Sequence, residues 1–329
     1  MWNMIQCAVQ GRGHISTETP CQDKTYVCCE NDTYVIALAD GAGSARLSHY
    51  GAEYVTKRAC EMLVADFDMF HAETDGVAIK RKVIGDLSSG LKAEAVKHDC
   101  QIKDLASTLL VAAIKEDKYI LIHIGDGVIG YLKGNELKVA SAPENGEFVN
   151  TTVFVTSNDV LYSMKIMKGS LGEIQGFTLM SDGTESSFYN KRENSLAIGL
   201  KKMMYLSQII DSEYLESEIR SSFEEVIRQN TTDDCSVALL VKADSTFCDS
   251  SIWMQKVQEK ILGYNKAKQG KKRMQRLEEV LSFLMTPNTL CAVARRIGVK
   301  KKYAKKYLDI LMRQSLVSQD GNLYFTTVK

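Results

Sequence analysis

The sequence lacks any long hydrophobic run. No apolar stretch approaches the roughly 18 to 20 residues that a transmembrane helix needs. The N-terminus, Met1 to Gln6, also lacks the basic segment followed by an apolar stretch that marks a secretory signal. We therefore expect a cytoplasmic protein that does not insert into a membrane.

Paired cysteine motifs are also missing. The cysteines number nine, which is odd, and none of them forms a Cys-x-x-Cys pair. This scatter argues against a disulfide framework and predicts free thiols, most of them buried. Four histidines, at 49, 71, 98 and 123, show no metal-ligand spacing with one another, so a zinc site is not indicated.

Net charge is absent, because 41 Lys and Arg balance 41 Asp and Glu. The balance hides an asymmetry, since residues 255–329 hold about 17 basic residues against about 5 acidic ones. The composition, 45% hydrophobic and 25% charged, is that of an ordinary globular protein. We predict a main domain over residues 1–250, a linker or connecting helix over 251–271, and a small domain over 272–329.

Short apolar runs alternate with helical stretches in the first 250 residues. Strands are predicted at Tyr34–Ala39, Leu109–Ile114, Tyr119–Ile124, Phe177–Met180 and Ser236–Val241, and helices at Ser48–Leu63, Leu196–Ile210 and Glu213–Gln229. Gly125-Asp126-Gly127 between apolar runs predicts a tight hairpin of Tyr119–Ile124 with Val128–Leu132. Short turns between strands favour an α+β layered sandwich over a doubly wound parallel sheet.

Four aspartates lie where a predicted strand ends or begins. Asp40 follows the first run, Asp126 lies between two runs, Asp182 follows Phe177–Met180, and Asp233 precedes the last run. Asp40, Asp126 and Asp182 have an alternative interpretation as simple turn formers, since Asp-Gly pairs favour turns. Their common position instead favours a cluster of carboxylates, whose mutual repulsion is best relieved by hard cations such as Mg²⁺ or Mn²⁺.

Ordered motifs make residues 1 to about 242 resemble the metal-dependent protein phosphatases of type 2C. The motifs are Gln22-Asp23, Ala39-Asp40-Gly41-Ala42-Gly43-Ser44, Ser107-Thr108-Leu109-Leu110-Val111, Ile124-Gly125-Asp126-Gly127, Met180-Ser181-Asp182-Gly183-Thr184 and Asp233-Asp234-Cys235-Ser236-Val237. The resemblance implies a four-layer α-β-β-α sandwich of two antiparallel sheets flanked by helices. It also implies hydrolysis of phosphoserine and phosphothreonine in a protein substrate, opposed by a serine/threonine kinase.

The resemblance further implies a site with two metal ions, or three. Asp40 would bridge two ions, the Gly41 carbonyl would bind one of them, and Asp182 and Asp233 would hold the other. Asp126 would join Asp182 at a third ion, and Asp23 would support water in the site. Catalysis would then proceed through a water activated by the cations.

Two residues near the N-terminus have open roles. His14 is interpreted either as a structural histidine or as a proton donor to the leaving group, because Ala42 occupies a position where many relatives have histidine. Arg12 is interpreted either as a phosphate clamp or as a surface ion pair. Thr108 is expected to support nearby backbone, and Gln22 replaces an acidic residue of the family.

The basic C-terminal region shows three amphipathic stripes and a hairpin pattern. The stripes are Met274 to Leu284, Leu290 to Ile297, and Tyr303, Tyr307, Leu308, Leu311 and Met312, and the hairpin spans residues 316–325. These features resemble a winged helix-turn-helix, with Lys300, Lys301, Lys302, Lys305 and Lys306 at the start of its recognition helix. Nucleic acid and protein remain alternative partners of residues 272–329.

Two functions from different classes therefore stay open. The leading hypothesis is a metal-dependent serine/threonine protein phosphatase. The alternative is a catalytically weak or inactive phosphatase-like regulator that binds nucleic acid or protein through its C-terminal domain, which the substitutions at Gln22 and Ala42 allow.

Overall fold

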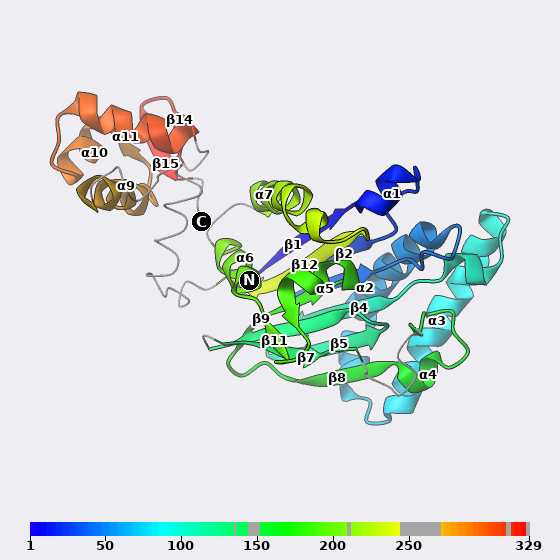
Figure 1. Ribbon diagram of the computed structural model, residues 1–329. Coiled ribbons are helices and arrows are strands. Elements are labelled where there is room, and N and C mark those ends of the chain that lie inside the picture. Colours follow the sequence, from blue (N-terminus) through cyan, green and yellow to red (C-terminus); the bar gives the residue numbers. More distant parts are fainter. Residues whose placement is uncertain (135, 144–151, 209–211, 244–270, 314–316, 327–329) are drawn as a thin grey trace. The chain divides into compact units, whose positions relative to one another are not determined.

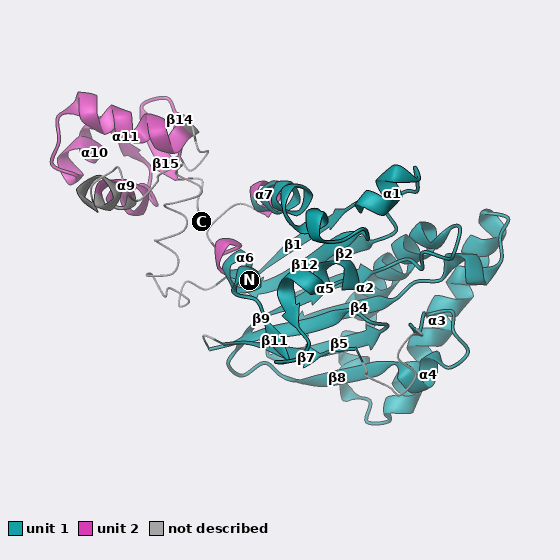
Figure 2. Ribbon diagram, viewed as in Figure 1, with its two compact units in different colours: residues 1–204, 215–243 teal, residues 205–214, 244–329 magenta. Residues whose placement is uncertain are grey.

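The computed structural model describes residues 1–134, 136–143, 152–208, 212–243, 271–313 and 317–326 (Figure 1). The chain forms two compact units, one of residues 1–204 and 215–243 and the other of 205–214 and 244–329 (Figure 2). The predicted linker 251–271 lies outside the described residues except for Lys271. No described helix is both long and apolar enough to cross a membrane.

Two five-stranded antiparallel sheets form the centre of the first unit. One sheet has the order β2 (Lys24–Glu30), β3 (Thr33–Ala39), β4 (Leu109–Lys115), β5 (Lys118–Ile124) and β8 (Lys165–Ser170). The other has the order β1 (Trp2–Val9), β12 (Cys235–Lys242), β9 (Ile174–Met180), β6 (Val128–Lys133) and β7 (Glu136–Ser141). The predicted α+β sandwich of two antiparallel sheets is confirmed.

Strand β3 shows why the central runs are apolar throughout. Successive side chains of a strand point to opposite faces of the sheet. Ile36 and Leu38 pack between the two sheets with Phe177 and Leu179 of β9. Val35, Ala37 and Ala39 join the cluster beneath the helices. Because both faces are buried, the strand has no polar side to alternate with.

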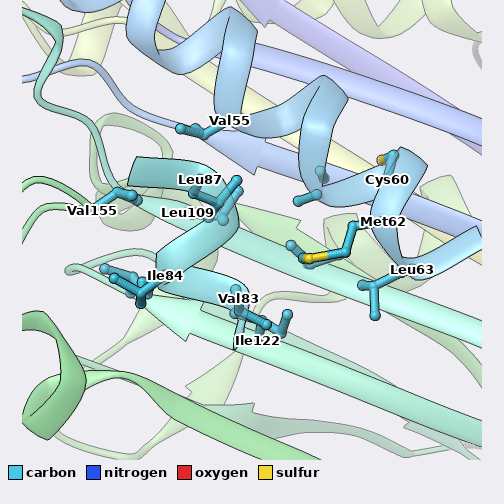
Figure 3. Close-up of a cluster of buried hydrophobic side chains, with 14 of the residues drawn as sticks. Val55, Cys60, Met62, Leu63, Val83, Ile84, Leu87, Leu109, Ile122 and Val155 are labelled. Atoms are coloured by element: carbon cyan, nitrogen blue, oxygen red, sulfur yellow. The ribbon is translucent and has the colours of Figure 1, made fainter. Parts of the chain in front are cut away.

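Two long helices, α2 (Ser48–Ala72) and α3 (Gly76–Lys97), cover the outer face of the β2-β3-β4-β5-β8 sheet (Figure 1). Val55 and Leu63 of α2 and Val83 and Leu87 of α3 bury their side chains against this sheet (Figure 3). Asp75 begins α3 by accepting a hydrogen bond from the Val77 amide at 2.8 Å, which satisfies one of the free N–H groups of the first turn. Helix α3 was not predicted from the sequence.

Helices also accompany the second sheet. They are α5 (Asp182–Phe188), α6 (Ile198–Leu206) and α7 (Ser212–Glu225). Phe188 of α5 packs against Phe223 of α7, with ring centroids 5.9 Å apart. The shorter elements of the unit are α1 (Arg12–Ser16), η1 (Ile102–Leu105), α4 (Val160–Ser163), β10 (Tyr189–Asn190), β11 (Ser195–Leu196) and η2 (Ile227–Asn230). Helices outside both sheets complete the predicted layered architecture.

The predicted hairpin of Tyr119–Ile124 with Val128–Leu132 is wrong. Strand β5 pairs with β4 and β8, whereas β6 pairs with β7 and β9 in the other sheet. The connecting residues carry the chain from one sheet to the other, and Gly125 turns it with a φ of +110°, which a residue with a side chain rarely adopts. Asp126 therefore lies in the segment that connects the two sheets. Strands β6 and β7 pair antiparallel with Lys133 opposite Glu136.

From residue 271 onward, the described part of the second unit contains three helices and a small sheet. They are α9 (Lys271–Phe283), α10 (Leu290–Arg296) and α11 (Lys301–Arg313), with β13 (Asn288–Thr289), β14 (Val317–Asp320) and β15 (Leu323–Thr326) in the order β13-β15-β14. Leu277, Val293, Leu308 and Tyr324 are among the residues of its own hydrophobic core. Gly298, with a φ of +61°, ends α10 in the left-handed conformation that favours glycine.

Candidate metal and phosphate site

Three carboxylates from different strand ends meet in the first unit. Asp40 follows β3, Asp126 connects β5 to β6, and Asp182 follows β9 as the first residue of α5. Each offers an oxygen, and these oxygens all lie within 4.8 Å of one another. Three of the four predicted strand-end aspartates thus come together, although they are up to 142 positions apart in the sequence, from 40 to 182.

Backbone hydrogen bonds hold Asp40 and Gly41. The Asp40 amide donates to Thr108 Oγ1 at 2.9 Å, and the Thr108 amide donates to the Asp40 carbonyl at 2.8 Å. The Gly41 amide donates to the Gln22 carbonyl at 3.2 Å. A Cβ on Gly41 would lie 2.8 Å from the Ser48 side chain, so only glycine fits there without displacement. Thr108 supports the backbone, as expected.

A buried histidine supports the loop that presents Asp126. His123 Nε2 lies 3.0 Å from the Gly125 carbonyl oxygen, and its Nδ1 lies 2.6 Å from Ser141 Oγ. Thr152 donates its hydroxyl to Asp126 Oδ2 at 2.5 Å. His123 had no predicted role. In the sequence, only the short spacing between His123 and Gly125 pointed to the contact of the histidine ring with the Gly125 carbonyl.

Asp233 and Asp234 occupy different environments although they are adjacent. Asp233 is exposed, lies outside the group of three oxygens, and contributes through its charge to the raised pKa values of Asp40 and Asp182. Asp234 is buried and accepts backbone hydrogen bonds from Gly11 at 2.6 Å and Gln22 at 2.5 Å. The Asp-Asp pair was visible in the sequence, but the structural role of Asp234 was not.

Arg12 and His14 lie against the segment that carries Asp233 and Asp234. Arg12 Nε donates to the Thr231 carbonyl at 3.1 Å and makes no ion pair with a described carboxylate. His14 Nδ1 lies 2.9 Å from Asp234 Oδ1. The surface ion pair considered for Arg12 is therefore absent from the described residues, and His14 has a buried carboxylate beside one ring nitrogen.

Burial and crowding disturb the acid groups of the site. Burial raises the pKa of Asp23 to about 8, and the charges of Asp234 and Asp182 act in the same direction. Burial and the charge of Asp126 raise the pKa of Asp182 to about 6. The pKa of Asp40 is held well above its usual range by burial and by the neighbouring carboxylates. Such a set is costly unless protons or cations neutralise it.

Unpartnered buried oxygens indicate which neutralising species would fit. Asp182 Oδ1 and Gln22 Oε1 are buried and have no hydrogen-bond partner among the described residues. Asp23 is buried as well, beside the Ser181 and Ser236 hydroxyls. A donor set made only of oxygen suits hard divalent cations and the water molecules they carry, and it does not suit zinc. The residues present therefore fit the metal ions that the sequence motifs imply.

The fold and this acidic cluster define a class of enzyme. The sequence profile of the protein phosphatase 2C family matches residues 10–239, which is most of the chain. The chain belongs to the protein phosphatase 2C family, and the predicted enzyme class, a metal-dependent phosphoprotein phosphatase, is confirmed.

Similar proteins agree with this assignment. Serine/threonine-protein phosphatase 3 of Escherichia coli (strain K12) is 24% identical over 260 residues, which cover 74% of this chain and 99% of that protein. The crystal structure of a bacterial serine phosphatase superposes with a TM-score of 0.52 at 15% identity, covering 75% of this chain and 100% of that one. The serine/threonine phosphatase Stp1 from Staphylococcus aureus gives 0.51 at 15% identity, covering 73% and 95%. The family profile ends at residue 239 and does not extend into residues 244–329 of the second unit.

Proposed function

We propose that this chain hydrolyses phosphoserine and phosphothreonine in a protein substrate, using Mg²⁺ or Mn²⁺ held by Asp40, Asp126, Asp182, Asp233 and the Gly41 carbonyl. The convergence of three strand-end carboxylates within 4.8 Å carries the proposal. The bound cations, two or three in number, would supply an activated water nucleophile and neutralise charge on the phosphoryl oxygens.

The surrounding residues have separable tasks. Asp23, buried and close enough to Asp182 for its charge to act on the pKa, is proposed to accept hydrogen bonds from water in the site. Arg12 is proposed to bind the substrate phosphate, because among the described residues its exposed guanidinium has one hydrogen-bond partner and no carboxylate partner. His14 is proposed to deliver the proton to the leaving oxygen, since Asp234 Oδ1, 2.9 Å from Nδ1, fixes the orientation of the ring.

A metal-dependent assay tests this function. The purified chain is incubated with para-nitrophenyl phosphate and with a phosphothreonine peptide, in Mn²⁺, in Mg²⁺ and in chelator. Turnover should require added metal, and Asp40→Asn should lower it by about a thousandfold or more, because the cluster loses its central carboxylate. Asp117→Asn, at an exposed turn outside the cluster, is the matched control and should retain activity.

The outcomes separate the alternatives. Full activity in Asp40→Asn would overturn the assignment of the site. No turnover of either substrate with any metal would instead support the regulator hypothesis, although membership in the phosphatase family does not favour it. Turnover of para-nitrophenyl phosphate without any turnover of phosphopeptides would point to small phosphate esters as substrates.

The domain organisation and the setting of the enzyme belong to the same proposal. We place the catalytic domain at residues 1–250, the connection at 251–271, and a winged helix-turn-helix at 272–329, supported by the three helices and the β14-β15 hairpin of the second unit. Its role would be to bind a partner, either nucleic acid or protein. We expect the enzyme to work in the cytoplasm, opposite a serine/threonine kinase that produces its substrate.

A further inference from the structure

A basic pocket lies within the second unit, apart from the acidic cluster of the catalytic site. It has a volume of about 690 Å³ and is formed by one face of α11, by the turn after α10, and by Arg276 of α9. Arg276, Lys300, Lys302 and Lys306 bring four positive charges to its wall. Since all of these residues belong to one compact unit, the pocket does not depend on how the two units meet.

The four cations lack anionic partners among the described residues. Neighbouring cations of the unit are paired, because Arg296 lies 3.3 Å from Glu279 and Lys305 lies 3.3 Å from Asp309. Within the described part of the unit, the side chain of Lys302 makes a cation–π contact, with Nζ 5.1 Å from the centre of the Tyr303 ring. Uncompensated like charges around one hollow favour the binding of an anion.

The remaining wall of the pocket is aromatic and apolar. Tyr303, Tyr307 and Ile310 line it, and Tyr307 and Ile310 also pack against the core of the unit. Tyr303 was predicted to face that core, yet its side chain is 45% exposed and borders the pocket instead. A free inorganic anion would leave this apolar wall unused, whereas a phosphate group attached to an organic side chain and its neighbours would cover it.

These features favour a phosphorylated peptide over nucleic acid. Three of the four pocket cations are lysines, which bind phosphate as point charges, whereas Arg276 alone among the four carries the planar fork best suited to base edges. The phosphates of a duplex form a row of contacts with polar groups on an exposed surface, and they would leave the apolar wall that contains Ile310 uncovered. A phosphopeptide supplies both a dianion for the lysines and apolar side chains for the tyrosines.

We infer that this pocket is a docking site for a phosphoserine- or phosphothreonine-bearing segment of the protein substrate or of a partner bound to it. The inference rests on the proposed function, because that function supplies the phosphoprotein. A second phosphate-binding site on the same chain would raise the effective concentration of a multiply phosphorylated substrate at the catalytic cluster.

Binding can be tested separately from catalysis. The full chain carrying Asp40→Asn, in chelator, cannot turn over the probe, and its metal-free acidic cluster repels phosphate. The probe is a fluorescein-labelled peptide pool with one phosphothreonine between randomised residues, and binding is followed by anisotropy. The unphosphorylated pool and a labelled 20-base-pair DNA duplex serve as competing ligand classes.

A matched pair of double variants locates the site. Arg276→Gln with Lys306→Gln removes two pocket cations, and Arg295→Gln with Lys301→Gln removes the same charges from residues that do not line the pocket. We expect the first pair to weaken phosphopeptide binding by about tenfold or more and the second by less than about twofold. Circular dichroism should show the same helix content in both variants.

Several results would overturn the inference. Equal losses in the two double variants would mean that only the general charge of the unit matters. Equal affinity for the unphosphorylated pool would show that the phosphate is not recognised. Tighter binding of the duplex than of the phosphopeptide pool, lost when the pocket cations are removed, would assign the pocket to nucleic acid. If docking fails while metal-dependent turnover persists, only the inference falls; if docking persists without turnover, only the catalytic proposal falls.

Discussion

Asp234 shows how one buried carboxylate organises the backbone around the catalytic cluster. It accepts amide hydrogen bonds from Gly11 and Gln22 and lies 2.9 Å from His14 Nδ1, so it joins three segments of the chain. An asparagine there would turn an N–H group toward one of these donors. We expect Asp234→Asn to lower the free energy of unfolding by about 2–4 kcal/mol, measured by urea denaturation in chelator.

The adjacent Asp233 provides the control for that experiment. Its side chain is exposed, so Asp233→Asn should change the free energy of unfolding by less than about 1 kcal/mol. The same variant should nevertheless lose metal-dependent turnover if Asp233 is a metal ligand as proposed. Equal destabilisation by the two substitutions would contradict the structural role of Asp234.

Thr108 gives a second test at the scale of single hydrogen bonds. Its hydroxyl accepts the Asp40 amide at 2.9 Å in a buried setting. Thr108→Val has nearly the same shape but leaves that N–H group without a partner, which should cost about 1–3 kcal/mol in unfolding free energy. Thr108→Ser keeps the hydroxyl and should be less affected. If Thr108→Val is more stable than Thr108→Ser in thermal or urea denaturation, the proposed role of the hydroxyl is wrong.

Packing of helix α2 against η1 is set by a glycine. A Cβ on Gly51 would lie 1.9 Å from the Leu105 carbonyl oxygen, whereas one on Gly85 of α3 would meet nothing within 4 Å. Gly51→Ala should therefore destabilise the protein by about 1–3 kcal/mol through overpacking. Gly85→Ala should stabilise it by about 0.5–1 kcal/mol, because alanine favours the helix. Urea denaturation checks both predictions, because the midpoint should fall in Gly51→Ala and rise in Gly85→Ala. Shifts of the same sign and size in the two variants would contradict them.

At the scale of elements, the sequence indicates strands better than it indicates their partners. The β-branched runs that become β3, β4, β5, β9 and β12 were all predicted, because both faces of these strands are buried. The link from β5 to β6 was misassigned, since Gly-Asp-Gly suits a hairpin and a crossing between sheets equally well. Helix α3 was missed although Ile79, Val83, Leu87 and Leu91 repeat at intervals of four, because glycines and polar residues interrupt the pattern.

At the scale of the whole molecule, the sequence predicted most of the residues that form the site, but it did not predict how deeply they are buried or which groups they contact. The order of the Asp motifs indicated the carboxylates that meet at Asp40, Asp126 and Asp182. Asp23 is deeply buried because segments distant in the sequence pack around it, and no local pattern specifies that packing. The same holds for the cations that gather beside Arg276 without an anionic partner among the described residues. Residues with a chemical signature were therefore found, while those that act through burial or through the lack of a partner were not.

The acidic cluster also links the stability of the whole protein to pH and metal. Without metal, Asp23 has a pKa of about 8 and Asp182 a pKa of about 6, both above the usual value near 4. A carboxyl with a raised pKa binds its proton more tightly in the folded state. Its stabilising contribution is full below pH 4 and is lost as the pH rises through the folded-state pKa.

In chelator, we therefore expect the melting temperature to fall between pH 5.5 and pH 8. Added Mn²⁺ or Mg²⁺ should raise it more at pH 8, where the carboxylates are ionised and can bind the cation without first losing protons. Burial lowers the pKa of His49, which acts in the opposite direction, so Asp182→Asn is the reference that isolates the cluster. That variant should show a weaker dependence on pH in chelator. A melting temperature that falls equally steeply in the variant would mean that the cluster is not the source of the linkage.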